Sequence, residues 1–307
     1  MNARFFTILC LTFLRGLESV VFMTMQRIEN PPAKRILAIH DLCGFGSTSL
    51  MVVIPIFSRF GIRVCALPTA LLSANTLYPG AAWQDTDAFM AKSIAHWKAE
   101  GMNFDAIYSG FLGNPQQAEL VASTFDMLSE GATGIVVDPV MADDGELYSC
   151  YDTSMIDAMR SLVAKADFIT PNYTEALMLC GMPYQGSCSN AKAIRLCHSL
   201  ARLGAKNVII TGVPVSDSSA FRVYHYCAMA DSLNYFDCKY LPYSYPGTGD
   251  IFASMLLAKI ISGNTMRCAI ETTISFIRSA ISGSMHYGIP LAEGVFLERF
   301  LSTGEED

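Results

Sequence analysis

The segment SYPGTGDIFASML combines small and acidic residues in a spacing that suits anion binding. Gly247 and Gly249 remove side chains where backbone N–H groups could turn towards a ligand, and Asp250 precedes an apolar pattern that predicts a helix over residues 251–261. A helix N-terminus offers unpaired N–H donors and the positive end of the helix dipole, so it can hold a phosphate beside a carboxylate. Alternatively, Thr248 or Asp250 serves as an ordinary helix cap.

Acidic, amide and hydroxyl residues also follow two apolar runs upstream of that segment. GIVVDPVMADDGELY carries Asp138 and Asp143, and DFITPNYTEA carries Thr170, Asn172 and Glu175. One or two carboxylates together with waters hold the Mg²⁺ that bridges nucleotide phosphates, so the carboxylates of this set could face such an ion. Each has a structural alternative. Asp138 precedes a proline and could end a strand in a turn, and Asn172 with Glu175 has the spacing of a capping box.

A third set of polar residues lies nearer the N-terminus. RILAIHD ends in His40 and Asp41, and CALPTALLSANT contains Thr69 and Ser73. A histidine in such a place is more often a structural residue than a catalyst, so no role is assigned to His40.

The elements that must position these residues alternate between short apolar runs and helical patterns. The predicted strands are Arg35–His40, Arg63–Leu67, Ala106–Gly110, Gly134–Asp138, Phe168–Thr170 and Asn207–Thr211. The predicted helices are Thr48–Phe60, Asp85–Ala99, Gln116–Ser129, Thr153–Ala164, Tyr173–Cys180 and Ala191–Leu203. This alternation predicts an α/β fold with a mostly parallel sheet covered by helices on both faces. Ligands of such sheets bind beyond the carboxyl ends of the strands, where the polar residues above are expected.

The overall composition limits the function classes. Hydrophobic residues make up 51% of the chain and charged residues 16%, as in a well-packed globular protein, and no linker or repeat divides it, so we expect one domain. A net charge of −7 without a Lys/Arg cluster argues against a nucleic-acid surface. The ten cysteines show neither a CxxC pair nor a Cys/His metal spacing, which predicts reduced thiols and a cytoplasmic protein.

The first residues form a separate question. The apolar run from Phe5 to Leu14 is too short to span a bilayer, and Arg15 and Glu18 interrupt its continuation. We interpret residues 1–24 as an extension upstream of the true start, with a signal peptide as the alternative. Their deletion is expected to leave folding and activity intact, because the first predicted strand begins near Arg35.

The ordered motifs DPVMADDGELY, ITPNYTEALML, VIITG and YPGTGDIFASMLLA resemble the ribokinase-like superfamily, and within it the vitamin B6 branch, the pyridoxal/pyridoxamine kinases. The resemblance covers a kinase domain over residues 35–302. It implies a three-layer sandwich and a homodimer that is not membrane-bound. It also implies Mg²⁺- and ATP-dependent phosphorylation of the 5′-hydroxymethyl group of pyridoxal, pyridoxine or pyridoxamine. A monovalent cation such as K⁺ is left open.

The resemblance also implies roles for individual residues. The backbone of Gly247, Thr248 and Gly249 forms the anion hole for the transferring phosphoryl group, and Asp250 is the base towards the substrate hydroxyl. Tyr148 lies where the family has a tyrosine on a mobile flap. The remaining residues expected to face Mg²⁺, the phosphates or the nucleotide are Asp138, Asp143, Thr170, Asn172, Glu175 and Thr211, with Asp138, Asp143 and Glu175 towards the metal, partly through water.

On the substrate side the chain departs from the family pattern. In IHDLCGFGSTS, Asp41 stands nearest to a family serine that contacts the pyridine nitrogen, and a carboxylate there would favour a protonated ring. Thr69 matches a family hydroxyl near the ring, and Phe111 matches an aromatic residue that packs on it or is simply part of the core. One alternative is hydroxymethylpyrimidine kinase, although its AGSDxSGGAG-type loop is missing. The other is a non-catalytic binding protein on the same scaffold, against which Asp250 and its glycines argue.

Overall fold

The computed structural model describes residues 33–129, 132, 134–217 and 219–302 of the 307-residue chain. All of these except Ala33 belong to the compact unit Lys34–Asp307. The expectations for residues 1–24 lie outside the described residues. No helix within the described part of the chain is long and apolar enough to cross a membrane.

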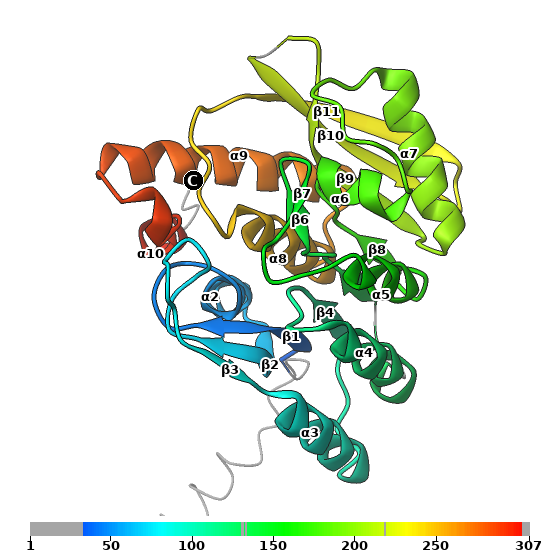
Figure 1. The fold of residues 1–307 in the computed structure, drawn as a ribbon, viewed down its shortest axis with the longest axis vertical. Helices are drawn as coiled ribbons and strands as arrows, with labels where there is room; N and C mark the ends of the chain where they lie inside the picture. The colour runs from blue at the N-terminus through cyan, green and yellow to red at the C-terminus, as the bar shows by residue number, and fades with distance from the viewer. Residues whose placement is uncertain (1–32, 130–131, 133, 218, 303–307) are drawn as a thin grey trace, which may run out of the picture. The chain divides into compact units, whose positions relative to one another are not determined.

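A sheet of nine strands, counted over the described residues, forms the middle layer of this unit (Figure 1). Its strands are β1 (Arg35–Cys43), β2 (Arg63–Leu72), β3 (Trp83–Asp85), β4 (Ala106–Ser109), β5 (Ile135–Val137), β8 (Phe168–Ile169), β9 (Asn207–Pro214), β10 (Ala220–Cys227) and β11 (Ser232–Lys239). They lie in the order β11-β10-β9-β8-β5-β4-β1-β2-β3. All pairings from β2 to β9 are parallel, whereas β3, β10 and β11 are antiparallel to their neighbours. The strands β6 (Ala142–Asp143) and β7 (Glu146–Leu147) form a separate hairpin.

Helices cover both faces of the sheet (Figure 1). One face is packed by α3 (Asp87–Ala99), α4 (Pro115–Leu128), α5 (Ser154–Val163), α6 (Tyr173–Leu179) and α7 (Asn190–Leu203). The other face is packed by α2 (Leu50–Arg59), α8 (Thr248–Ile261) and α9 (Met266–His286). The chain continues through the short helices η1 (Leu291–Glu293) and α10 (Leu297–Ser302).

Strand β1 shows why the apolar runs fold this way. Successive side chains of a strand point to opposite faces, and in the Ile36–Ile39 part of β1 both faces are apolar and fully buried. Leu37 and Ile39 pack among the residues of α3 and α4, whereas Ile36 and Ala38 pack against α2 and α8. The expected α/β fold, with a mostly parallel sheet between two helical layers, is confirmed.

Several element boundaries differ from the prediction. β1 and β2 continue to Cys43 and Leu72, so Thr69 lies inside a strand, and α8 already begins at Thr248. The hairpin of β10 and β11 and the helix α9 were not predicted from the sequence. Side chains of β10 and β11 mix buried with half-exposed positions, which gives a weaker pattern than the fully apolar strands.

Candidate functional site

The PGTGD turn is fixed by close packing against the loop before α2. Gly247 caps α8 with a left-handed backbone at φ 83°, a conformation that glycine adopts without a steric penalty. A Cβ atom on Gly247 would lie 2.3 Å from the backbone oxygen of Ser47, so no side chain fits there. The turn therefore needs glycine both for its conformation and for its contact with this loop.

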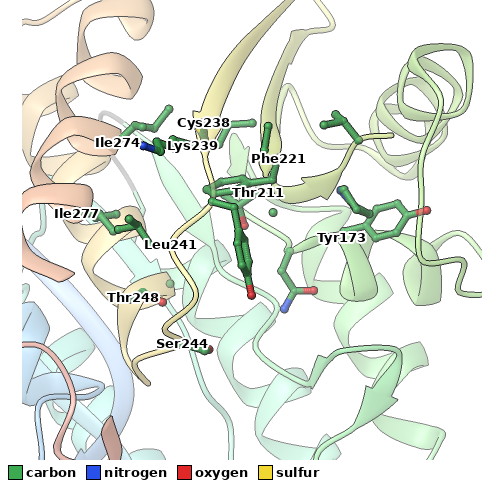
Figure 2. A pocket seen from close by; sticks show the side chains of 18 of the residues that line it. Tyr173, Thr211, Phe221, Cys238, Lys239, Leu241, Ser244, Thr248, Ile274 and Ile277 are labelled. Atoms are coloured by element: carbon green, nitrogen blue, oxygen red, sulfur yellow. The ribbon is translucent and has the colours of Figure 1, made fainter. Parts of the chain in front are cut away.

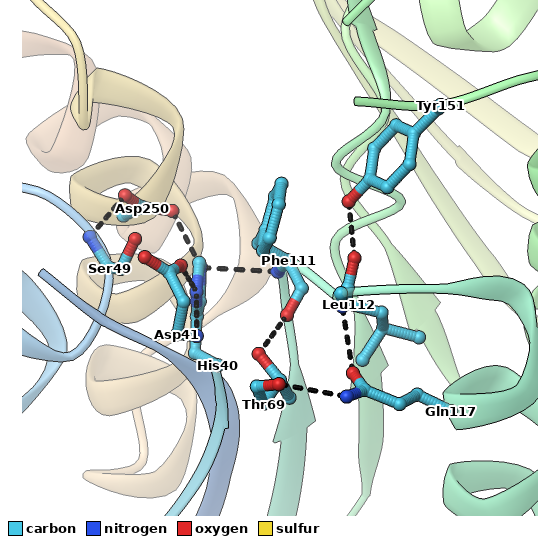
Figure 3. A network of polar contacts seen from close by, with 10 residues as sticks. His40, Asp41, Ser49, Thr69, Phe111, Leu112, Gln117, Tyr151 and Asp250 are labelled. Atoms are coloured by element: carbon cyan, nitrogen blue, oxygen red, sulfur yellow. Dashed lines mark hydrogen bonds and ion pairs between the residues drawn. The ribbon is translucent and has the colours of Figure 1, made fainter. Parts of the chain in front are cut away.

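Asp250 lies in the first turn of α8, as predicted, and both of its carboxylate oxygens have partners (Figure 3). Oδ1 is 2.9 Å from Nε2 of His40, and Oδ2 accepts a hydrogen bond of 2.7 Å from the backbone N–H of Ser49. Ser49 caps the N-terminus of α2 and has a positive φ of 57°, which is rare for a residue with a side chain. The carboxylate is thus held between β1 and the start of α2.

His40 bridges two carboxylates. Its Nδ1 atom lies 2.8 Å from Oδ1 of Asp41, while Nε2 faces Asp250, and the side chain is 1% exposed. Burial alone would lower the pKa of His40, but Asp250 and then Asp41 outweigh it and raise the pKa from 6.5 to about 10. Each ring nitrogen lies within hydrogen-bond distance of a carboxylate, which favours the protonated form of the ring. Sequence reasoning assigned no role to His40, because a local pattern cannot reveal a contact with a residue 210 positions away.

Asp138 and Thr170 lie beside the turn. Asp138 is buried, and its Oδ1 accepts a hydrogen bond of 3.0 Å from the hydroxyl of Thr170. A Cβ atom on Gly249 would lie 3.9 Å from Oδ2 of Asp138, so this carboxylate faces the glycine turn. Burial, and then the charge of Asp250, raise the pKa of Asp138 to about 7. The structure thus brings together the predicted residues Asp138, Thr170, Gly249 and Asp250.

Asn172 and Glu175 form the capping box that their spacing indicates. The Asn172 side chain accepts from the Glu175 N–H at 2.9 Å, and Oε2 of Glu175 accepts from the Asn172 N–H at 2.8 Å. Oε1 of Glu175 accepts from the N–H of Met141 at 3.1 Å, and the Asn172 amide donates to the oxygen of Ala142 at 2.7 Å. Burial and the nearby Asp138 raise the pKa of Glu175. Each oxygen of Glu175 thus already accepts one backbone hydrogen bond.

A cavity of about 750 Å³ opens in front of the turn (Figure 2). Thr248 and Gly249 line it at the N-terminus of α8, together with the predicted residues Asp143, Asn172 and Thr211. Its other lining residues include the apolar Leu241, Ile274 and Ile277 beside charged residues such as Lys239 and Arg278. An elongated ligand with an anionic end and an apolar end suits this arrangement, because the helix N-terminus favours negative charge. Sequence reasoning missed the apolar walls, which come from the segment after β11 and from α9.

Asp143 and Tyr148 lie on and next to the β6–β7 hairpin. Asp143 is exposed and accepts a hydrogen bond of 2.9 Å from the N–H of Asp144. Tyr148 is half-buried, and its N–H donates to the oxygen of Met141 at 2.9 Å. Burial, and then Glu175, raise the pKa of the Tyr148 hydroxyl well above its usual value.

Phe111 lies beside the His40 ring, within an aromatic group. Its ring centroid is 5.9 Å from that of Trp83 and 5.5 Å from that of Tyr151. The Thr69 hydroxyl is fully buried and donates to the oxygen of Phe111 at 2.8 Å (Figure 3). Thr69 thus ties the segment after β4 to β2, and Phe111 is packed beside the His40 network.

Comparisons with known proteins agree on a kinase family. The family described as phosphomethylpyrimidine kinase matches residues 54–293. A Bacteroides thetaiotaomicron protein assigned as a phosphomethylpyrimidine kinase, whose crystal form contains pyridoxal, is 40% identical, with a TM-score of 0.84 over 88% of this chain and 95% of that one. A hydroxymethylpyrimidine/phosphomethylpyrimidine kinase of Haemophilus influenzae is 28% identical over 83% of this chain and 93% of its own length. A pyridoxine/pyridoxal/pyridoxamine kinase of Bordetella bronchiseptica is 28% identical over 81% and 90%.

Proposed function

The chain belongs to the phosphomethylpyrimidine kinase family, and on that premise we propose that it transfers the γ-phosphoryl group of ATP to the 5′-hydroxymethyl group of a vitamin B6 vitamer, pyridoxal, pyridoxine or pyridoxamine. The observation that carries this proposal is the placement of Asp250. Its carboxylate is held by His40 and Ser49 at the N-terminus of α8, and it directly follows Thr248 and Gly249, which line the cavity. A carboxylate there can orient an acceptor hydroxyl and take its proton as the new P–O bond forms.

The cavity suits ATP as the donor. Leu241, Ile274 and Ile277 offer an apolar surface for the base, and Thr248 and Gly249 offer backbone N–H groups for the phosphates. Such N–H groups stabilise the negative charge of phosphoryl transfer without reorganising during the reaction.

Mg²⁺ bound with ATP would offset the charge of the phosphates. Asp138 is the carboxylate best placed to face it, because Thr170 occupies only its Oδ1 and Oδ2 lies on the side of Gly249. Among the described residues no group of three or more His, Cys, Asp or Glu is arranged to hold a metal, which fits an ion that depends on phosphates and water. Asp143 and Glu175 would act through water. Homodimerisation and a monovalent cation stay predictions.

Asp41 and Phe111 support a pyridine-ring acceptor. Asp41 is buried and paired with the His40 ring, and a buried carboxylate favours a ring that carries a proton. Phe111, between Trp83 and Tyr151, offers an aromatic surface for stacking. Pyridoxal in the crystals of the 40% identical protein adds to this support.

Hydroxymethylpyrimidine is the second candidate acceptor, favoured by the family description and by the Haemophilus relative. The deciding experiment measures kcat/KM with Mg·ATP over the three B6 vitamers and hydroxymethylpyrimidine. We expect at least one vitamer to be the better acceptor. A higher kcat/KM for hydroxymethylpyrimidine would move the assignment to the pyrimidine reaction, and no turnover with any of the four would contradict both.

A further inference from the structure

We propose that His40 is a positioning residue for phosphoryl transfer: its ring holds the Asp250 carboxylate in one orientation and connects it to Asp41. The inference rests on the proposed function, because the acceptor hydroxyl is the group that Asp250 would meet. It concerns a residue to which the sequence motifs assign no role.

The contacts of Asp250 explain why the ring matters. A helix backbone places the Cα atom of Asp250 but leaves its side-chain torsions free, so the carboxylate plane needs other restraints. His40 supplies one restraint at Oδ1, and the Ser49 N–H supplies the other at Oδ2. Without His40, only the hydrogen bond from the Ser49 N–H restrains the carboxylate, which can then rotate. Such a rotation should lower the rate, because small displacements of a reacting group reduce reaction rates strongly.

The ring of His40 is itself held in place. It is 1% exposed, and it meets the ring of Tyr108 edge-on at a centroid distance of 6.1 Å. On another side, a Cβ atom on Gly110 would lie 2.1 Å from Cδ2 of His40. A ring enclosed in this way cannot change its rotamer. It therefore fixes the Asp250 carboxylate relative to β1.

The charge of the ring has a second effect. Asp250 and Asp138 are near enough for the first to raise the pKa of the second, and phosphates would add more negative charge beside them. The titratable groups that face the His40 ring are Asp41, Asp250 and Tyr108. Both ring nitrogens of His40 face carboxylates, which raise its pKa to about 10, and an imidazolium ion in this place would balance part of this charge. A glutamine at position 40 would keep an N–H donor without the charge, which separates orientation from charge.

The kinetic test compares His40→Ala and His40→Gln with the wild-type protein. We expect His40→Ala to lower kcat about 10- to 100-fold with little change in KM for ATP, and His40→Gln to recover part of the loss. Gly110→Ala, which pushes on the ring and leaves His40 in place, should lower kcat as well. His225→Gln is the control: His225 is also buried, on β10, and its partner is Asn207. Its kcat should equal that of the wild-type protein.

A second readout needs no turnover and keeps this inference separate from the proposed function. Imidazole ¹⁵N spectra of the wild-type protein, with the His40 signals assigned from His40→Gln, should show both ring nitrogens protonated at pH 7.5. Asp250→Asn should move the Nε2 signal. A folded His40→Ala protein with kcat within about threefold of the wild-type value would overturn the positioning role. So would an Nε2 signal that does not change in Asp250→Asn, even if the acceptor proved to be a pyrimidine or was never found. A neutral His40 ring would overturn the charge effect.

Discussion

Nε2 of His40 lies 2.9 Å from Oδ1 of Asp250, although the two residues are 210 positions apart. His40 belongs to β1, in the interior of the sheet, and Asp250 to the first turn of α8, which packs on one face of that sheet. The contact therefore joins the first described strand to the PGTGD turn. The candidate base Asp250, His40 and Asp41 therefore belong to one hydrogen-bonded group.

Replacing the candidate base tests the proposed chemistry. Asp250→Asn keeps the size of the side chain but cannot accept the hydroxyl proton, so we expect kcat to fall by at least ~10²-fold while KM for ATP changes little. Single-turnover phosphorylation measures the effect, and thermal unfolding checks the fold. If Asp250 only capped the helix, the change would cost about 1 kcal/mol of stability and leave the rate almost normal.

Charge on His40 should make stability depend on pH. Its pKa is about 10 in the folded protein and near 6.5 in the unfolded chain, so between these values the folded state binds more protons. Its contribution to stability is full below pH 6.5 and is lost as the pH rises towards 10. Urea unfolding should show that the stability difference between wild-type and His40→Gln proteins shrinks from pH 6.5 to pH 9.5.

His225 should make the stability of the protein change with pH in the opposite direction. Burial lowers the pKa of His225, so the unfolded chain binds more protons and the folded protein loses stability as the pH falls below about 6.5. His225→Gln should remove that loss. An unchanged difference between wild-type and His40→Gln proteins across the alkaline range would contradict a charged His40.

Gly247 and Gly263, which flank α8, allow the effect of close packing at the PGTGD turn to be separated from backbone strain. Both have positive φ, 83° at Gly247 and 92° at Gly263, but only Gly247 has a close neighbour, the Ser47 oxygen. Gly263→Ala should cost about 1–2 kcal/mol from backbone strain alone. Gly247→Ala should cost about 1–3 kcal/mol more and also lower kcat, because the turn must move away from the loop before α2. Equal losses of stability would show that the contact with Ser47 does not restrain the turn.

Asn172 allows its capping role to be separated from a nucleotide role. Asn172→Ser keeps a good helix cap but removes the amide at the cavity wall together with its hydrogen bond to the oxygen of Ala142, so stability should fall by about 1–3 kcal/mol. If the amide contacts ATP, KM for ATP should rise about tenfold, as expected for the loss of one hydrogen bond to a charged group. Asn114→Ser changes the cap of α4, whose residues do not line the cavity, and should leave KM unaltered. A normal KM in Asn172→Ser would leave Asn172 with the capping role alone.

Local patterns were enough to predict most of the parallel sheet and part of the site. The apolar runs at Ile36–Ile39 and Val208–Ile210 fold as buried strands because an interior strand needs apolar side chains on both faces. Asp250 was expected at the start of a helix, as observed. The Asn172–Glu175 capping box could be recognised because it depends only on two residue types three positions apart. The boundaries of β1, β2 and α8 were less accurate, because tertiary pairing extends or begins an element beyond its local signal.

The sequence by itself determined the chemical groups, their order along the chain and the family to which they belong, since these depend on residue types and short spacings. Only the tertiary structure decided that His40 lies within hydrogen-bond distance of Asp250, that Ser49 holds the second oxygen, and that α9 supplies a cavity wall. These features depend on distances between residues far apart in the chain and on the burial that packing creates. Burial and neighbouring charges set the protonation of a side chain, and neither is written in its immediate sequence neighbours.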